Sequence, residues 1–186
     1  MKRPALFLDR DGVINKYKPY VHRVEDFQFI DGIFDLVAAA QLAGYLTVVV
    51  TNQAGIGRGL YTEEDFWSVT DWMIAQFAEH GCRIDGVYFC PTHPEHGVGR
   101  YRVESEYRKP RPGMLLQAAT ELKISLPSSI MVGDKLSDMQ AGIAAGVGAN
   151  LFFGPSPCAD TDEYLAVDTL RDVIGHLHPW PTAGGD

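Results

Sequence analysis

The segment Ala5-Leu6-Phe7-Leu8-Asp9-Arg10-Asp11-Gly12 runs from four apolar residues straight into a charged cluster. A short, fully apolar run of this kind is typical of a strand that is covered on both faces of its sheet. Similar runs recur at 46–50, 87–90, 130–132 and 150–153, with segments of helical length between them. This alternation predicts an α/β fold built on a doubly wound parallel sheet.

The segments between the strands carry ordinary helix signals. Gly44 follows the first of them, in the position where glycine commonly ends a helix. Thr62 stands before the second, and Asp65 is placed three residues on to complete a capping box. Helices are expected at 33–43, 62–80, 113–122, 137–145 and 169–177. The aromatic residues of the second helix that are predicted to lie in the core are Trp67, Trp72 and Phe77.

The composition is that of one globular domain. The chain has 186 residues, of which 46% are hydrophobic and 22% charged, and we expect a single domain over 1–178 followed by a loose tail at 179–186. The net charge of −8 argues against binding to nucleic acid or to a membrane surface. Three cysteines without redox-motif spacing, and no apolar leader or spanning segment, predict a cytoplasmic protein without a disulfide framework: Cys82, Cys90 and Cys158.

Polar residues follow the expected strands at four places, and ligands of open parallel sheets bind at the carboxyl ends of strands. The four groups are 9–12, 51–53, 108–110 (just before a helix) and 133–135, with Asp138 one helical turn after the last. Each group taken alone is also common as a turn or strand end. Their joint occurrence in these positions favours a binding or catalytic site.

Two carboxylates, Asp9 and Asp11, lie two residues apart at the end of the first strand and so point the same way. A divalent cation would keep Asp9 ionised and nucleophilic, while Asp11 could carry a proton for a leaving group. Further oxygen ligands are available from Asp134 and Asp138, and such ligands suit Mg²⁺. The alternative is that Asp11-Gly12 forms only a turn beside a solvated Asp9.

Two further groups fit phosphoryl chemistry. The hydroxyl of Thr51 and the backbone N–H groups after it could bind phosphoryl oxygens, although Thr and Asn also commonly end a strand. Lys109 could neutralise charge in a transition state, and the alternative is a solvated lysine before a helix.

Four segments together resemble the haloacid dehalogenase (HAD) superfamily of phosphohydrolases: Phe7–Asn15, Thr51–Gly59, Arg108–Met114 and Val132–Asp138. Within it, the chain is similar to D,D-heptose 1,7-bisphosphate phosphatases and to the related histidinol-phosphate phosphatases, over about residues 5 to 155. The resemblance implies hydrolysis of the 7-phosphate of a small sugar bisphosphate, in nucleotide-activated heptose synthesis. It also implies a fold without a large cap domain, and the chain has no insertion long enough for one. We expect a monomer.

The resemblance also implies roles for individual residues. Asp9 would be the nucleophile and Asp11 the general acid/base. Magnesium would be held by Asp9, by the backbone carbonyl of Asp11 and by Asp134. Thr51 and Lys109 would stabilise the phosphoryl group. The residues expected to contact the substrate are Tyr17, Lys18, Pro19, Tyr20, Asn52, Gln53, Ala54, Arg108 and Lys135. The alternative role for Lys135 is to orient the acidic groups.

The irregular stretch 91–112 departs from the family. Its relatives hold a structural zinc on a C-x-H pair followed by C-x-C, and the matching positions here are Cys90, Thr92, Ser105 and Tyr107. One thiolate does not hold a tetrahedral zinc, and the nearby histidines lack ligand spacing. We therefore predict a zinc-free loop that is held by packing and by ion pairs of Glu104, Glu106, Arg100 and Arg102.

Three other functions are open to this sequence. A histidinol-phosphate or broad sugar-phosphate phosphatase would use the same chemistry. A phospho-accepting signalling domain is also an acidic doubly wound sheet, but it takes phosphate on a middle strand, whereas the paired acids here close the first. A non-catalytic sugar-phosphate binder would have no need for every catalytic position to be intact.

Overall fold

A computed structural model describes residues 2–154 and 163–181. Cys158 and residues 182–186 of the expected tail lie outside the described residues. Within the described part, no helix is both long enough and apolar enough to span a bilayer.

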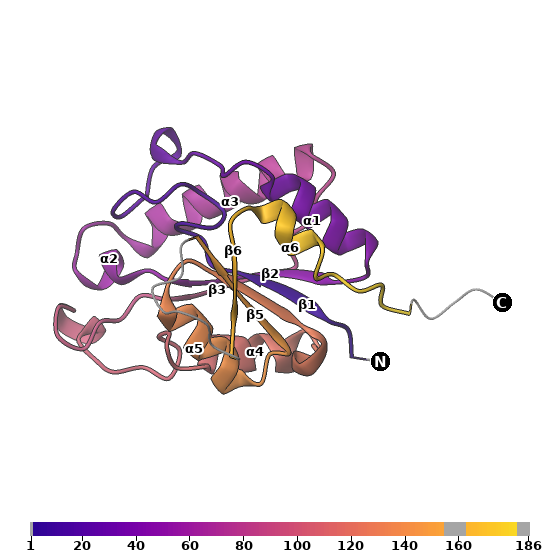
Figure 1. Ribbon diagram of the computed structural model, residues 1–186. Coiled ribbons are helices and arrows are strands. Elements are labelled where there is room, and N and C mark those ends of the chain that lie inside the picture. Colours follow the sequence, from indigo (N-terminus) through magenta and orange to yellow (C-terminus); the bar gives the residue numbers. More distant parts are fainter. Residues whose placement is uncertain (1, 155–162, 182–186) are drawn as a thin grey trace.

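One parallel sheet organises the chain (Figure 1). Its strands, in the order β3-β2-β1-β4-β5-β6, are β1 (Ala5–Leu8), β2 (Leu46–Asn52), β3 (Gly86–Cys90), β4 (Ile130–Gly133), β5 (Ala149–Phe153) and β6 (Leu165–Val167). In the register, Leu8 at the end of β1 lies beside Val49 of β2 and Val132 of β4, so β4 ends close to the end of β1 while β2 continues beyond both to Asn52. The predicted α/β class and doubly wound sheet are confirmed. The edge strand β6 was not among the expected strands, and Leu165 at its start is 55% exposed, so no buried apolar run marks it.

Helices cover both faces of the sheet. They are α1 (Ile33–Leu42), α2 (Ala54–Gly57), α3 (Glu63–Glu79), α4 (Gly113–Glu121), α5 (Leu136–Ala145) and α6 (Leu170–Ile174), with short 3-10 turns at Val24–Asp26, Gly99–Tyr101 and Leu126–Ser128. Figure 1 shows α1, α3 and α6 on one side of the sheet and α4 and α5 on the other. The helix expected at 169–177 is shorter than predicted, because it ends at Ile174 before Gly175.

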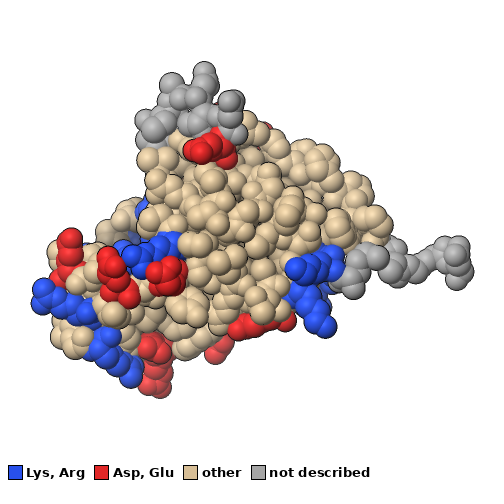
Figure 2. Space-filling view, turned by 90° about the horizontal axis from the view of Figure 1, so that it is seen from below, with Lys and Arg blue, Asp and Glu red and all other residues tan. Residues whose placement is uncertain are grey.

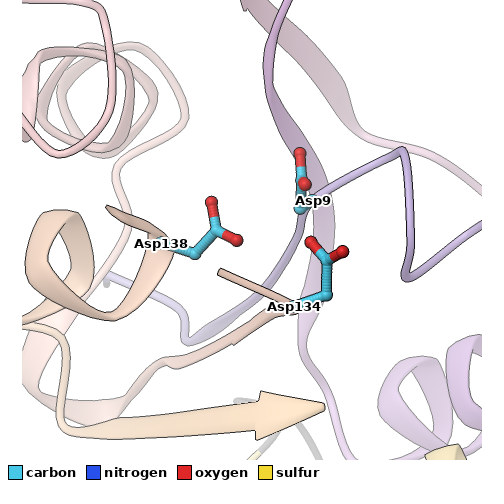
Figure 3. A group of neighbouring side chains, drawn as sticks. All are labelled: Asp9, Asp134 and Asp138. Atoms are coloured by element: carbon cyan, nitrogen blue, oxygen red, sulfur yellow. The ribbon is translucent and has the colours of Figure 1, made fainter. Parts of the chain in front are cut away.

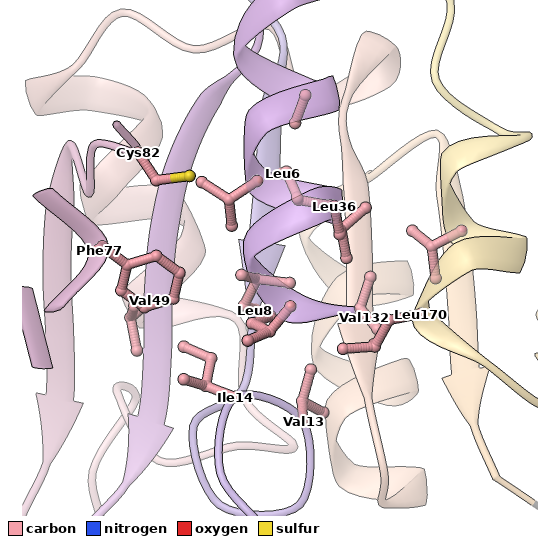
Figure 4. Close-up of a cluster of buried hydrophobic side chains, with 14 of the residues drawn as sticks. Leu6, Leu8, Val13, Ile14, Leu36, Val49, Phe77, Cys82, Val132 and Leu170 are labelled. Atoms are coloured by element: carbon pink, nitrogen blue, oxygen red, sulfur yellow. The ribbon is translucent and has the colours of Figure 1, made fainter. Parts of the chain in front are cut away.

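The alternation of side chains along β1 divides the core into two layers. Leu6 and Leu8 face α1, α3 and α6, where they pack with Leu36 and Phe77 (Figure 4). Phe7 points the other way and packs with residues of α4 and α5. Both faces of the strand are therefore buried, which is why it consists of apolar residues only.

The second expected helix, α3, tests two sequence predictions. Its capping box is present: Asp65 N donates to Thr62 Oγ1 at 3.0 Å, and Thr62 N donates to the Asp65 carboxylate at 2.8 Å. Phe77 is fully buried and Trp72 packs against the core, as predicted. Trp67 was predicted wrongly, since it is 37% exposed and lies beside Phe66 and Phe89 at the rim of a small separate cluster.

The surface on the side of α4 and α5 carries acidic and basic side chains that are intermixed (Figure 2). No broad basic patch is visible on this face among the described residues. A surface of this kind offers little electrostatic attraction to a phosphate backbone.

Candidate active site

Three carboxylates meet at the carboxyl edge of the sheet. Asp9 follows β1, Asp134 follows β4 and Asp138 lies in the first turn of α5, and each offers an oxygen within 4.8 Å of the others. Their side chains turn toward a common point (Figure 3). These carboxylates thus lie at the edge of the sheet where ligands of open parallel sheets bind.

Two glycines allow the carboxylates to approach so closely. A Cβ on Gly12 would lie 2.1 Å from an oxygen of Asp134, and the φ angle of Gly12 is +102°, which L side chains rarely adopt. A Cβ on Gly133 would lie 2.2 Å from the side chain of Asp138. Any larger residue at either position would push a carboxylate out of the group.

The electrostatics of Asp134 fit a bound cation. Its Oδ1 atom is buried and has no hydrogen-bond partner among the described residues, and the nearest cation, Lys135 Nζ, is 3.9 Å away. Burial, and then the charge of Asp9, raise the pKa of Asp134 to about 7. A divalent cation would remove this repulsion, and carboxylate oxygens are the ligands that Mg²⁺ prefers. The donor set present therefore suits Mg²⁺.

Lys109 lies at the centre of the group and is 3% exposed. Its Nζ contacts Asp9 Oδ1 at 2.9 Å, Asp138 Oδ1 at 2.7 Å and the carbonyl oxygen of Val50 at 2.7 Å. Burial by itself lowers the pKa of Lys109, but the carboxylates of Asp138 and Asp9 outweigh burial and raise it above its ordinary value. The ammonium group is therefore charged at every physiological pH.

Asp138 holds this lysine in place. One oxygen accepts from Lys109, and the other accepts from the backbone N–H of Lys135 at 3.0 Å. Asp138 was expected to be a further metal ligand, and it lies close enough to be one. Its carboxylate is, however, already engaged in fixing Lys109 and the start of α5.

Asn52 holds the same lysine from the other side. Its amide donates to Lys109 O at 3.0 Å and accepts from Lys109 N at 3.1 Å, so the end of β2 is clamped to the segment before α4. Asn52 was expected to contact the substrate, and in this structure both ends of its amide bind the backbone of Lys109.

Asp11 lies outside the three-carboxylate group, in a shell of hydrogen-bond donors. Arg10 Nη2 donates to both of its oxygens at 2.9 and 3.0 Å, Asn15 Nδ2 donates at 3.1 Å, and Gln53 Nε2 donates at 3.0 Å. Arg10 is 1% exposed and is tied to the backbone by a bond from Nη2 to the carbonyl oxygen of Val21 at 2.7 Å.

Sequence reasoning missed two members of this shell, Arg10 and Asn15. Both belong to the motif that was singled out, but neither position has a local pattern that reveals its partner. The sequence does place Arg10 between two aspartates. This signal could have been used, because an arginine that becomes buried needs a paired acid.

Comparisons with known proteins identify the family. A HAD-hydrolase-like family model matches residues 106–151. A D-glycero-α-D-manno-heptose-1,7-bisphosphate 7-phosphatase from Burkholderia mallei is 56% identical over 187 aligned positions, which cover 99% of each chain. A D-glycero-β-D-manno-heptose-1,7-bisphosphate 7-phosphatase from Vibrio cholerae is 51% identical, and the alignment covers 95% of this chain and 97% of the relative. The chain belongs to the heptose-bisphosphate phosphatase family of the HAD superfamily.

Solved structures agree with this assignment. A HAD-like phosphatase from Mesorhizobium loti matches with a TM-score of 0.88 at 35% identity, covering 95% of this chain and 86% of that one. The D,D-heptose 1,7-bisphosphate phosphatase from B. bronchiseptica, complexed with magnesium and phosphate, matches with a TM-score of 0.82 at 28% identity and covers 95% of this chain and 98% of that one. HAD phosphatases use Mg²⁺, in agreement with the acidic group found here.

The loop before the first 3-10 turn carries four of the residues that were expected to contact the substrate, at positions 17–20. Tyr17 and Tyr20 are 63% and 41% exposed. The Nζ of Lys135 lies 5.1 Å from the centre of the Tyr17 ring, and the Arg58 guanidinium lies 6.0 Å from that of Tyr20. The structure thus places Lys135 and the Tyr17 ring side by side.

The other residues that were expected to contact the substrate differ in their exposure and in their partners. Lys18 is paired with Asp26, so its charge is directed to the neighbouring turn. Pro19 is exposed and Ala54 is half-buried at the start of α2. Arg108 is half-buried and donates from Nη1 to the carbonyl oxygen of Thr92 at 3.1 Å; burial lowers its pKa, and the charge of Arg58 lowers it further.

Contacts between side chains hold the loop 91–112 and its flanks. Cys90 Sγ lies 3.3 Å from Thr92 Oγ1. Arg111 binds Glu104 at 3.0 Å and Glu106 at 2.5 Å. The expected ion pairs were partly wrong: both glutamates pair with Arg111, while Arg100 reaches back to Glu63 of α3 at 3.6 Å.

We expect purified protein to contain no stoichiometric zinc, because Cys90 is the one thiolate at the four positions that hold zinc in relatives. Metal analysis by plasma mass spectrometry of protein purified without chelators measures this directly. One zinc per chain would contradict the prediction.

Proposed function

We propose that this chain removes the 7-phosphate from D-glycero-D-manno-heptose 1,7-bisphosphate through a phospho-aspartate formed on Asp9. The observation that carries the proposal is the Asp9 carboxylate, 2.9 Å from the Lys109 ammonium and beside Asp134 and Asp138, in a chain 56% identical over its full length to a protein named for this reaction. Nucleotide-activated heptose synthesis is the pathway in which such a product would be used.

In the first step, a carboxylate oxygen of Asp9 attacks phosphorus and the bond to the sugar oxygen breaks. Asp11 gives its proton to the departing sugar oxygen. The Lys109 ammonium and the Thr51 hydroxyl bind the phosphoryl oxygens as their charge develops. Mg²⁺, held by Asp9, Asp134 and the backbone carbonyl of Asp11, would neutralise charge on the phosphoryl group and on the nucleophile.

In the second step, water attacks phosphorus of the phospho-aspartate. Asp11, now ionised, takes a proton from that water, and the Asp9 carboxylate leaves as inorganic phosphate forms. One residue thus serves as acid and then as base. Lys109 enters the reaction charged, because burial is outweighed by the carboxylates of Asp138 and Asp9, which raise its pKa.

The rim residues are proposed to bind the sugar. Tyr17 and Tyr20 present exposed rings, and Lys135 and Arg108 add positive charge, which suits a substrate with a second phosphate. Lys18, Pro19 and Ala54 belong to the same proposed rim, and Asn52 would act through Lys109. We also propose a monomer.

A cytoplasmic location is supported by cysteine chemistry. Cys82 and Cys90 are free and buried, as is usual in a reducing compartment. The signalling-domain hypothesis has no support from the comparisons, whose relatives over nearly the full chain are named phosphatases.

The substrate assignment is tested by measuring kcat/KM for both anomers of heptose 1,7-bisphosphate, for histidinol phosphate and for common hexose phosphates. We expect a heptose bisphosphate to be preferred over histidinol phosphate by at least about 100-fold, which corresponds to about 3 kcal/mol of differential transition-state binding. Equal or better turnover of histidinol phosphate would overturn the substrate assignment while leaving the phosphatase chemistry intact.

Mg²⁺ is expected to stabilise metal-free protein against thermal unfolding, by about 2.7 kcal/mol when its concentration is one hundred times its Kd. The effect should be larger above pH 7 than below it, because Asp134, with a pKa of about 7, must lose its proton before it binds a cation. Differential scanning calorimetry with and without Mg²⁺ measures the increment.

Asp134→Asn serves as the control for this prediction. It removes the charge of one ligand and should abolish most of the increment and its pH dependence. An unchanged increment in this variant would show that the cation binds elsewhere.

A further inference from the structure

Gln53 lies directly after β2, is 1% exposed, and uses both N–H donors and the carbonyl oxygen of its side-chain amide. Its Nε2 donates to Asp11 Oδ2 at 3.0 Å and to Thr51 Oγ1 at 2.9 Å. Its Oε1 accepts from the hydroxyl of Tyr61 at 2.5 Å. A primary amide has two N–H bonds, and here one points at each of two groups with proposed roles in catalysis.

The orientation of this amide is determined by its partners. The reverse orientation would place Oε1 against the Asp11 carboxylate, so that acceptor faced acceptor. Tyr61 reinforces the observed orientation, because its hydroxyl donates to Oε1. Burial raises the pKa of Tyr61 above its ordinary value, so that the hydroxyl keeps its proton.

Tyr61 is itself held firmly. Its ring is 6% exposed and is stacked on His22, with ring centres 5.0 Å apart and planes 1° from parallel. It packs so tightly under α2 that a Cβ on Gly55 would lie 2.1 Å from it. The donor to Gln53 therefore has a fixed position.

These bonds have consequences for both partners of Gln53. Thr51 accepts the bond from Nε2, so its own O–H remains free to donate to a phosphoryl oxygen. Asp11 is held on its Oδ2 side by the same nitrogen, while Arg10 and Asn15 hold the rest of the carboxylate. The phosphoryl-binding hydroxyl and the acid/base are thus set at a fixed spacing by one amide.

We propose that Gln53, locked by Tyr61, is a positioning residue that aligns Asp11 and Thr51 on the same phosphoryl group. This assignment replaces the expectation that Gln53 lines the sugar pocket, and it rests on the proposed acid/base role of Asp11. Tyr61 was not singled out from the sequence, and it acts through Gln53 without touching the substrate.

The test compares two phosphate esters that differ in their need for a general acid. A sugar alkoxide leaves only with a proton, whereas the nitrophenolate of p-nitrophenyl phosphate leaves without one. We would measure kcat/KM on heptose bisphosphate and on the aryl ester for wild type, Tyr61→Phe and Gln53→Met. Asp11→Asn is the reference for loss of the acid.

Tyr45→Phe is the matched control. It removes a hydroxyl from another buried tyrosine, 4% exposed, which precedes the opposite end of the same strand. Both of its kcat/KM values should equal those of wild type. Tyr61→Phe keeps the packed ring, so the fold is expected to be retained, and Mg²⁺-dependent hydrolysis of the aryl ester reports on a folded site.

We expect Asp11→Asn to lose about 100-fold or more on the sugar ester and far less on the aryl ester. Tyr61→Phe and Gln53→Met should show the same selectivity, with kcat/KM falling at least about tenfold more on the sugar ester and the loss carried by kcat. Gln53→Met should also lose some activity on the aryl ester, because Thr51 is no longer oriented.

Two outcomes would overturn the positioning proposal and leave the proposed phosphatase function intact. The first is an equal loss of kcat/KM on both esters in Tyr61→Phe and Gln53→Met. The second is a loss in Gln53→Met that comes only from a higher KM for the sugar ester, because this would mean that Gln53 contacts the sugar. If Asp11→Asn loses both esters equally, the acid role fails, and the positioning proposal fails with it. If wild type hydrolyses neither ester, the proposed phosphatase function itself is overturned.

Discussion

Asp9→Asn is expected to lower kcat for phosphate release by about 10,000-fold or more, because loss of a catalytic nucleophile has effects of this size in other hydrolases. The amide has nearly the same shape as the carboxylate, and its oxygen could still accept from Lys109, which lies 2.9 Å from Asp9 Oδ1. An amide is, however, a poor nucleophile and a weak ligand for Mg²⁺. A sensitive assay for inorganic phosphate under saturating substrate measures the loss.

The matched control for Asp9→Asn is Asp35→Asn. The side chain of Asp35 is 63% exposed on α1, and its ion pair with Arg171 spans 3.7 Å. This variant should keep the wild-type rate. Activity of Asp9→Asn within a factor of a few of wild type would remove Asp9 from its role and favour a water-attack mechanism or a different nucleophile.

Lys109→Met is expected to lower the free energy of unfolding by about 3–5 kcal/mol, because it leaves buried carboxylates without their cation. The Nζ of this lysine is 2.9 Å from Asp9 and 2.7 Å from Asp138, and both side chains are almost fully buried. Methionine has a similar length, so the loss reports on charge more than on packing. Urea unfolding of metal-free protein gives the free energy.

The same variant should lose at least about 100-fold in kcat, because a preorganised donor to the phosphoryl group is gone. Lys135→Met is the control for stability. The side chain of Lys135 is 50% exposed and its Nζ lies 3.9 Å from the nearest acid oxygen, so the free energy of unfolding should change by less than about 1 kcal/mol. A Lys109→Met protein as stable as wild type would contradict the view that Lys109 compensates the buried charges of Asp9 and Asp138.

Two general rules predicted the sheet and the edge at which the candidate site residues gather. Apolar runs such as 46–50 had to be buried on both faces, and that requirement gave the strands of the central sheet. The polar residues after those runs then had to meet at one edge. Asp9, Thr51, Lys109 and Asp134 lie at that edge in the structure.

The features that were missed depend on contacts between distant segments. Arg10 and Tyr61 acquire their meaning only when β1, β2 and the segment before α3 lie together. Strand β6 is an exposed edge with three residues, too short to show a buried pattern. Trp67 follows the helical sequence of α3 but faces the rim of a small cluster, so hydrophobic character alone overestimated its burial.

The loop at 91–112 shows a different limit. Its charged residues predicted ion pairs, but several arrangements of the same charges were possible. The structure selects Arg111 for both glutamates because the start of α4 returns to the loop, with Gly113 N donating to Glu106 O at 2.9 Å. Nothing within the loop sequence specifies that return.

The proposed mechanism depends on a covalent bond between Asp9 and phosphorus. This bond is tested most directly by acid-quenching Asp11→Asn during turnover of p-nitrophenyl phosphate and reducing the quenched protein with borohydride. The aryl ester forms the intermediate without a general acid, whereas its hydrolysis lacks the base, so the intermediate should accumulate. An acyl phosphate at residue 9 is converted to homoserine, which peptide mass spectrometry locates. We predict homoserine at position 9 in substrate-treated protein and none without substrate; an unmodified Asp9, or modification at another aspartate, would contradict the mechanism.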